Sequence, residues 1–197
     1  MNVENYTGEP CSLSEVFARQ KELKFAFEPD AKELFENFDI DVYEDQEQFK
    51  RYCWRITEEL CEANEALISG EWKHFLEEII DGFNFLVELI MLYGWGPSDV
   101  TGLPEDVKEP ESVKSKDLRD DIFTIIYSLG LTANLLKNRQ WRQSQHLTDL
   151  FVFERRLKGS WLNYMLLFER CGLGPREITK LYDRKNKVNK FRINTNY

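Results

Sequence analysis

Two pairs of acidic residues, each with a spacing of three positions, are the residues of this sequence best suited to hold a metal ion. Glu59 and Glu62 form the first pair, and Glu78 and Asp81 form the second after 15 intervening residues. Residues three apart on a helix are neighbours on its surface, so each pair can present two carboxylates together. Carboxylate oxygens without His or Cys suit magnesium or manganese, and magnesium completes its shell with waters and substrate phosphates. The pattern therefore predicts metal-dependent hydrolysis of a phosphoanhydride, in which Glu59 or Glu62 orients or deprotonates the water.

The hydrophobic pattern separates the first pair from ordinary surface glutamates. At 100° per residue, Glu59 lies about 70° and Glu62 about 130° from the centre of the buried stripe of their helix. Glu58 and Glu65 point nearly opposite to that stripe and are expected in solvent. Glu59 and Glu62 are therefore expected at the rim of the core.

The second pair lies in a segment, residues 72–93, that is apolar around most of its circumference and is expected to be buried. Glu78, Asp81 and Glu88 share one face of this helix. Buried carboxylates are costly unless they are paired or bound to metal. Few basic residues of the same helical hairpin are placed to pair with all three, so a metal ion is the economical explanation.

Helical periodicity dominates the chain, and no strand alternation is convincing. A capping box of Ser12 and Glu15 predicts the start of a helix that runs to about Phe27. Gly and Pro breaks separate the later helices, and a Pro-, Glu-, Ser- and Lys-rich linker is expected at about 102–116. The other predicted helices are 31–38, 43–68, 72–93, about 118–138, about 150–170, and one that starts near Pro175.

An internal repeat is visible between the two halves of the sequence. Residues 67–73 resemble 136–142, and residues 94–97 resemble 172–175, which predicts two stacked helix-turn-helix units. The acidic pairs have no counterpart in the second copy, so packing of the bundle does not require them. We expect a single all-α domain over residues 1–197, with its parts in this order: a first repeat at about 43–97 with the metal site, the linker, a second repeat at about 118–175, and a basic segment at 176–197.

Composition limits the possible functions. The 197 residues are 42% hydrophobic and 31% charged, which indicates a globular chain, and the net charge of -9 argues against non-specific nucleic-acid binding. The N-terminus shows no secretory signal, and no apolar run is long enough to span a bilayer. The four cysteines form no CxxC pair and are expected to be free thiols. A soluble cytoplasmic protein is predicted.

The C-terminal segment is basic although the protein is acidic. Arg184, Lys185, Lys187, Lys190 and Arg192 fall within nine residues. A basic segment that folds over a carboxylate–metal site is what a triphosphate needs.

The two acidic pairs match the ExxE…ExxD signature of the all-α NTP pyrophosphatase (MazG-like) superfamily. The closest resemblance is to dimeric dUTPases and the related phage dCTPase/dUTPases, and it spans roughly residues 20–197. Trp72-Lys73 is similar to a Trp-Lys stretch of those enzymes, and residues 81–85 are similar to their Asp-x-x-His-Phe, with Asn84 in place of His. Residues 182–192 resemble Tyr-x-x-Lys-Asn-x-x-Asn-x-Phe-Arg, but Asn196 replaces the Gly of the family's Gly-Tyr end.

The resemblance implies hydrolysis of dUTP to dUMP and pyrophosphate by a magnesium-dependent homodimer, and the oxygen ligands would also suit manganese. It assigns residues to three roles: metal ligands Glu59, Glu62, Glu78 and Asp81; phosphate or nucleotide ligands Lys185, Asn189 and Arg192; and base contacts Gln20, Trp72 and Asn84. The departures at Asn84 and Asn196 affect the choice of base more than the class of reaction.

Three alternatives stay open. The same chemistry on dCTP, or on both pyrimidines, is the first, and a purine nucleotide is the second. The third is a non-catalytic helical scaffold or regulator in which the acids bind ions only to stabilise the fold.

Overall fold

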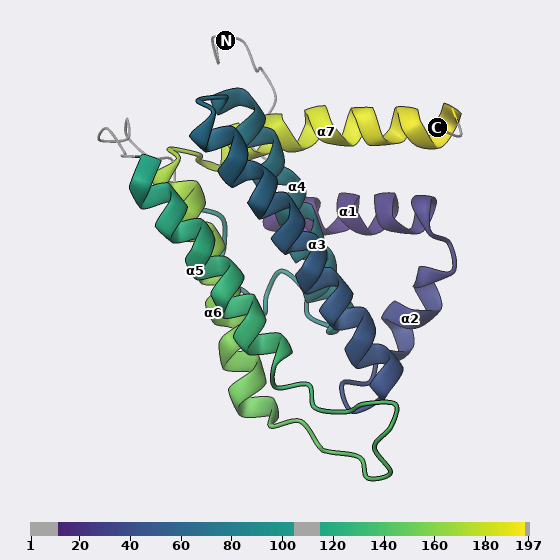
Figure 1. Ribbon diagram of the computed structural model, residues 1–197. Coiled ribbons are helices and arrows are strands. Elements are labelled where there is room, and N and C mark those ends of the chain that lie inside the picture. The colour runs from purple at the N-terminus through teal and green to yellow at the C-terminus, as the bar shows by residue number, and fades with distance from the viewer. Residues whose placement is uncertain (1–11, 105–114, 196–197) are drawn as a thin grey trace.

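The computed structural model describes residues 12–104 and 115–195, which form helices and loops without a strand (Figure 1). The predicted all-α class is confirmed. The helices of the described residues are α1 (Leu13–Phe27), α2 (Ala31–Asn37), α3 (Tyr43–Ile68), α4 (Trp72–Leu92), α5 (Ser115–Ala133), α6 (Leu150–Arg170) and α7 (Pro175–Thr195). The predicted capping box is present, because Ser12 and Glu15 exchange hydrogen bonds at the start of α1.

One helix ends earlier than the sequence pattern indicated. The helix predicted at about 118–138 is α5, which stops at Ala133. The side chain of Asn138 donates a hydrogen bond to the Asp41 carbonyl oxygen at 2.7 Å, and Gln46 accepts one from the Asn138 N–H at 2.9 Å. These contacts with Asp41 and with the start of α3 hold residues 134–138 in a turn and a loop. Because both partners are distant in sequence, the periodicity of the segment could not reveal them.

Some sequence features lie outside the described residues, namely Cys11, the greater part of the predicted linker, and the terminal Asn196 and Tyr197. Cys53, Cys61 and Cys171 are free thiols. Among helices of the described ranges, none combines the length and the apolar character needed to cross a membrane.

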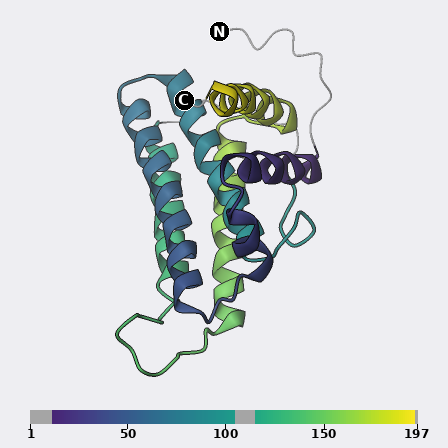
Figure 2. The same ribbon diagram turned by 90° about the vertical axis from the view of Figure 1, so that its right-hand side faces the viewer.

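Two helical hairpins lie side by side and make up the bundle (Figure 1). Helices α3 and α4 form one hairpin, α5 and α6 form the other, and α3 contacts α5 between them. Helices α1 and α7 run next to each other across the bundle, where both contact α4 (Figure 2). The interpretation of the hairpins as duplicated units of one domain stays a prediction.

Helix α4 is the most buried element of the fold, as its apolar circumference predicted. More than half of its side chains are buried, and they include Ile79, Phe83 and Val87 at 0% exposure. Gly82 allows a close approach to its neighbours, because a Cβ atom there would lie 2.5 Å from Tyr164 Oη and 3.4 Å from Glu59 Cβ. Tyr164 Oη is fixed by a 2.8 Å hydrogen bond that it donates to the Ile79 carbonyl. The small residue therefore lets α3 and the Tyr164 side chain of α6 approach α4 beside the acidic residues.

Candidate active site

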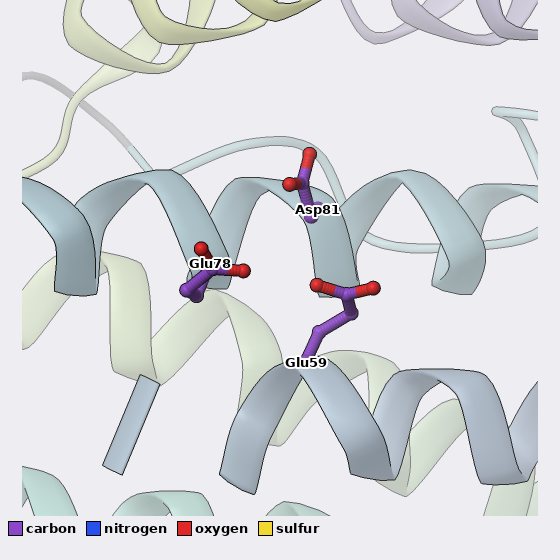
Figure 3. Close-up of side chains that lie close together, drawn as sticks. All are labelled: Glu59, Glu78 and Asp81. Atoms are coloured by element: carbon purple, nitrogen blue, oxygen red, sulfur yellow. The ribbon is translucent and has the colours of Figure 1, made fainter. Parts of the chain in front are cut away.

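Three carboxylates from two helices converge at the centre of the α3–α4 hairpin. Gly70, with a φ of 74°, reverses the chain between the helices. Glu59 lies nine residues before the end of α3, and Asp81 lies nine residues after the start of α4, so antiparallel packing brings them level. Glu78 lies one turn before Asp81, and one carboxylate oxygen from each of the three lies within 4.8 Å of the others (Figure 3).

The charges of these carboxylates oppose one another. Burial, a hydrogen bond with Glu78 and the nearby charges of Asp81, Glu78 and Glu62 raise the pKa of Glu59 to about 8. Burial also raises the pKa of Asp81, although Lys185 acts in the opposite direction. A divalent cation would relieve this repulsion, and three oxygen donors suit a hard ion. The arrangement therefore fits a metal site.

Glu62 does not join the cluster in this structure. Its side chain is exposed, and the grouped carboxylates are Glu59, Glu78 and Asp81. It is still close enough for its charge to raise the pKa of Glu59. The sequence placed Glu62 farther than Glu59 from the buried stripe, and this difference separates the two in space. Its role as a fourth ligand stays a prediction.

The basic side chains that face these acids come from α7 and α1 as well as from α4 itself. Lys185 of α7 forms an ion pair with Asp81, and His74 Nδ1 lies 3.0 Å from Glu78 Oε1. Glu88 is also paired, because Lys24 of α1 lies 3.5 Å from its Oε2. Glu88 therefore needs no metal ion to offset its burial, because α1 supplies Lys24 as its partner. The cations of the hairpin alone did not indicate this pair, which tertiary packing forms.

A cleft of about 310 Å³ opens beside the carboxylates between α1, α3, α4 and α7. Glu59 and Asp81 lie at its wall. The structure brings most of the predicted nucleotide-binding residues to this one cleft, namely Gln20, Asn84, Lys185, Asn189 and Arg192. The volume is within the range of small-molecule sites. The carboxylates and the basic α7 residues thus face a common space.

Gln20 and Asn84 have different surroundings in the cleft. Gln20 Nε2 donates to Glu88 at 2.7 Å and Gln20 Oε1 accepts from Tyr182 Oη at 2.9 Å, so both ends of this amide are held by the protein. Asn84 is 8% exposed, and its Oδ1 atom has no hydrogen-bond partner in the described part of the chain. A buried acceptor without a partner is costly. Asn84 is therefore the stronger candidate for a direct ligand contact.

Trp72 does not reach this cleft. It is the first residue of α4, is 45% exposed, and packs its ring on Phe75 with centroids 4.9 Å apart. The cleft contains aromatic and basic residues that sequence reasoning missed: Phe85, with Arg55 5.3 Å from its ring centroid, and the buried Lys24. Arg55 precedes Glu59 by one helical turn, a spacing that could have identified it. No signal in the sequence distinguished Lys24 from other α1 cations.

A comparison with protein families gives one match. A family model described as dUTPase covers residues 64–197, which is more than half of the chain. The chain belongs to the dUTPase family. No curated protein and no solved structure gives a match.

The dUTPase match includes Glu78, Asp81 and the whole of α7 with Lys185, and begins after Glu59 and Glu62. Membership of the dUTPase family supports a hydrolase of the nucleotide pyrophosphatase type. The convergence of Glu59 with Glu78 and Asp81 is an observation of the structure that this match does not cover.

Proposed function

We propose that this protein hydrolyses dUTP to dUMP and pyrophosphate, with magnesium as the metal. The observation that carries the proposal is the ion pair of Lys185 with Asp81 at the wall of the cleft. It places the basic face of α7 beside the three clustered carboxylates. A metal-bound triphosphate needs such a combination of oxygen ligands and cations.

Glu59, Glu78 and Asp81 would hold the ion, and Glu62 is within one helical turn of Glu59 as a further ligand. Magnesium would polarise the phosphate and lower the pKa of a bound water. Lys185, Asn189 and Arg192 would bind phosphate oxygens, because all three line the same cleft as Glu59 and Asp81. Manganese would substitute, since it accepts the same oxygen ligands.

The reaction needs a water molecule positioned next to one phosphorus atom. The water oxygen forms a new bond to a phosphorus of the α–β bridge, the P–O bond of that bridge breaks, and the group on its other side leaves with the electron pair: pyrophosphate for attack at the α-phosphorus, dUMP for attack at the β-phosphorus. Glu59 and Glu62 are the candidates to orient the water and accept its proton. The resemblance to dimeric dUTPases also leads us to propose a homodimer.

A second candidate substrate is dCTP, because the surroundings of Asn84 would accept either pyrimidine base. The Asn84 carboxamide offers both an acceptor and a donor, and its buried Oδ1 has no partner. This acceptor would suit the ring N–H of uracil or the exocyclic amino group of cytosine, which is a donor. Gln20 would fix the position of Glu88 in the wall of the cleft, since both ends of the Gln20 amide are already hydrogen bonded within the protein.

The test is release of pyrophosphate from a panel of nucleoside triphosphates, with and without magnesium. We expect magnesium-dependent release from dUTP, with dCTP as the next-best substrate. Faster turnover of dCTP would reverse the ranking of the two bases. If no nucleotide is cleaved and Glu59→Gln changes only thermal stability, the protein is a scaffold that binds ions.

A further inference from the structure

A second cavity of about 240 Å³ adjoins the cleft on the neighbouring face of α7, and we call it the α4–α7 cavity. Its wall contains Glu77 and Ile80 of α4 and three basic residues of α7, namely Arg184, Lys185 and Arg192. Lys185 and Arg192 also line the cleft. The two spaces therefore share a wall of two cations, and the carboxylate cluster lies beside that wall.

The charge of the α4–α7 cavity differs from that of the whole protein. Three cations and one carboxylate line it, whereas the chain has a net charge of -9. Its carboxylate, Glu77, lies 3.3 Å from Arg184 and 3.6 Å from Lys73. Glu77 is paired with Arg184 and Lys73, and Lys185 is shared with Asp81 of the carboxylate cluster, so the basic side chains of the wall outnumber its carboxylate. Such a cavity suits a phosphate group.

The two spaces and the carboxylates follow one another along α4. Glu77 and Ile80 line the α4–α7 cavity, Asp81 follows Ile80 and lines the start of the cleft, and Asn84 and Glu88 line the cleft farther along α4. At a rise of 1.5 Å per residue, Glu77 lies about 6 Å before Asp81, and Glu88 lies about 10 Å after it. This order fits an elongated ligand with phosphates at one end, a metal-binding centre and a base at the other.

We infer that the α4–α7 cavity binds the terminal phosphates of the substrate and the pyrophosphate product, with Arg184 as their additional ligand. The inference rests on the proposed function and deepens it, since Arg184 is not among the residues that the sequence resemblance assigned to the nucleotide. Arg184 exchanges Glu77 for a phosphate oxygen when the ligand binds. Glu77 thus competes with the anion. Loss of the Arg184 charge and loss of the Glu77 charge therefore have opposite effects on the affinity for phosphate.

The experiment measures binding of pyrophosphate to the full chain by calorimetry with magnesium in excess. Arg184→Ala should weaken binding about fivefold or more, because a charge-assisted contact to phosphate is lost. Glu77→Gln should tighten it, because Arg184 is released. Arg176→Ala is the matched control: it removes the same charge from an exposed position of α7 that lines neither space. Binding of dUMP, which lacks the terminal phosphates, should be unchanged by Arg184→Ala.

Equal affinities for pyrophosphate in Arg184→Ala and Arg176→Ala would overturn the inference, and so would weaker binding in Glu77→Gln. Circular dichroism and thermal melting establish that each variant is folded, and the Glu77→Gln result stands even if Arg184→Ala is unstable. The outcomes also separate the two proposals. If the wild type cleaves dUTP but Arg184→Ala binds pyrophosphate normally, only this inference fails. If no nucleotide is cleaved, the proposed function fails, whereas the binding comparison still decides whether the cavity takes pyrophosphate.

Discussion

The Lys185 ammonium group lies against the Asp81 carboxylate, so the basic helix α7 is attached to α4 at the edge of the carboxylate cluster. This contact uses one of the three acids that could hold a metal ion. A metal ion and Lys185 therefore compete for Asp81, whereas a bound phosphate would attract Lys185 away from it. Metal and nucleotide are expected to favour each other's binding for this reason.

Replacement of Lys185 by alanine should separate its competition with the metal ion for Asp81 from its contact with the phosphate. We expect kcat/KM for dUTP to fall at least tenfold, because a phosphate contact is lost. Binding of magnesium without nucleotide should become tighter, because a competing cation is removed from Asp81. Calorimetry and steady-state kinetics measure the two effects, and Lys187→Ala, an exposed lysine of the same helix, is the control. Weaker magnesium binding in Lys185→Ala would contradict the competition.

Replacement of Glu59 by glutamine should remove a metal ligand without a large change in shape. We expect the magnesium-dependent rate to fall by about 100-fold or more. Glu65→Gln makes the same chemical change at an exposed position six residues later in α3 and should leave the rate near that of the wild type. Equal rates in the two variants would remove Glu59 from the site.

Stability of the metal-free protein should fall as pH rises from about 5 to about 8. The pKa of Glu59 is raised from its ordinary value of 4.5 to about 8 by burial and by the nearby acids. The folded state then holds a proton that the unfolded chain has released, so its stabilising effect is present at low pH and is lost as pH rises through about 8. Magnesium should reverse the loss, because it replaces the proton among the carboxylates. Thermal melting at several pH values, with and without magnesium, measures both trends.

The Glu59→Gln variant serves as the control for that pH dependence. Its amide does not titrate, so the fall in melting temperature between pH 5 and 8 should become smaller. If the slope is unchanged, other groups cause the pH dependence.

Replacement of Lys24 by methionine should destabilise the fold. The Lys24 and Glu88 side chains are only 4% and 6% exposed, and Glu88 would lose its ion-pair partner. We expect a loss of about 3 kcal/mol in the free energy of unfolding. This is the lower end of the range for removal of one partner of a buried ion pair, because Glu88 can take up a proton. The double variant Lys24→Met/Glu88→Gln should recover part of it. Urea denaturation measures both, and a double variant no more stable than Lys24→Met would contradict the pairing.

A methyl group at Gly82 should be tolerated poorly. It would lie 2.5 Å from Tyr164 Oη, which is buried and hydrogen bonded to the Ile79 carbonyl. We expect Gly82→Ala to cost about 1 to 3 kcal/mol through overpacking, despite the higher helix propensity of alanine. Gly130→Ala is a suitable comparison, because it lies in α5 with open space around the added atom and should be neutral or stabilising. A destabilisation of the same size in both variants would rule out the contact with Tyr164 as the cause.

The sequence alone determined the helices, the burial of α4 and the family of the chain. The start of α1 is set by a local signal, the Ser12 capping box, and the apolar circumference of α4 is a local pattern, whereas the end of α5 depends on tertiary contacts of Asn138. The number of residues between Glu59 and the hairpin turn, and between the turn and Asp81, can also be counted in the sequence. These features depend on neighbours in the chain, so periodicity can identify them.

Only the tertiary structure decided which side chains meet. It grouped Glu59 with Glu78 and Asp81, left Glu62 exposed, and kept Trp72 outside the cleft. It also supplied Lys24 to the buried Glu88. The physical reason is that the packing of the helices on one another and the directions of their side chains set such contacts. The spacing of residues within one helix does not fix the position of another.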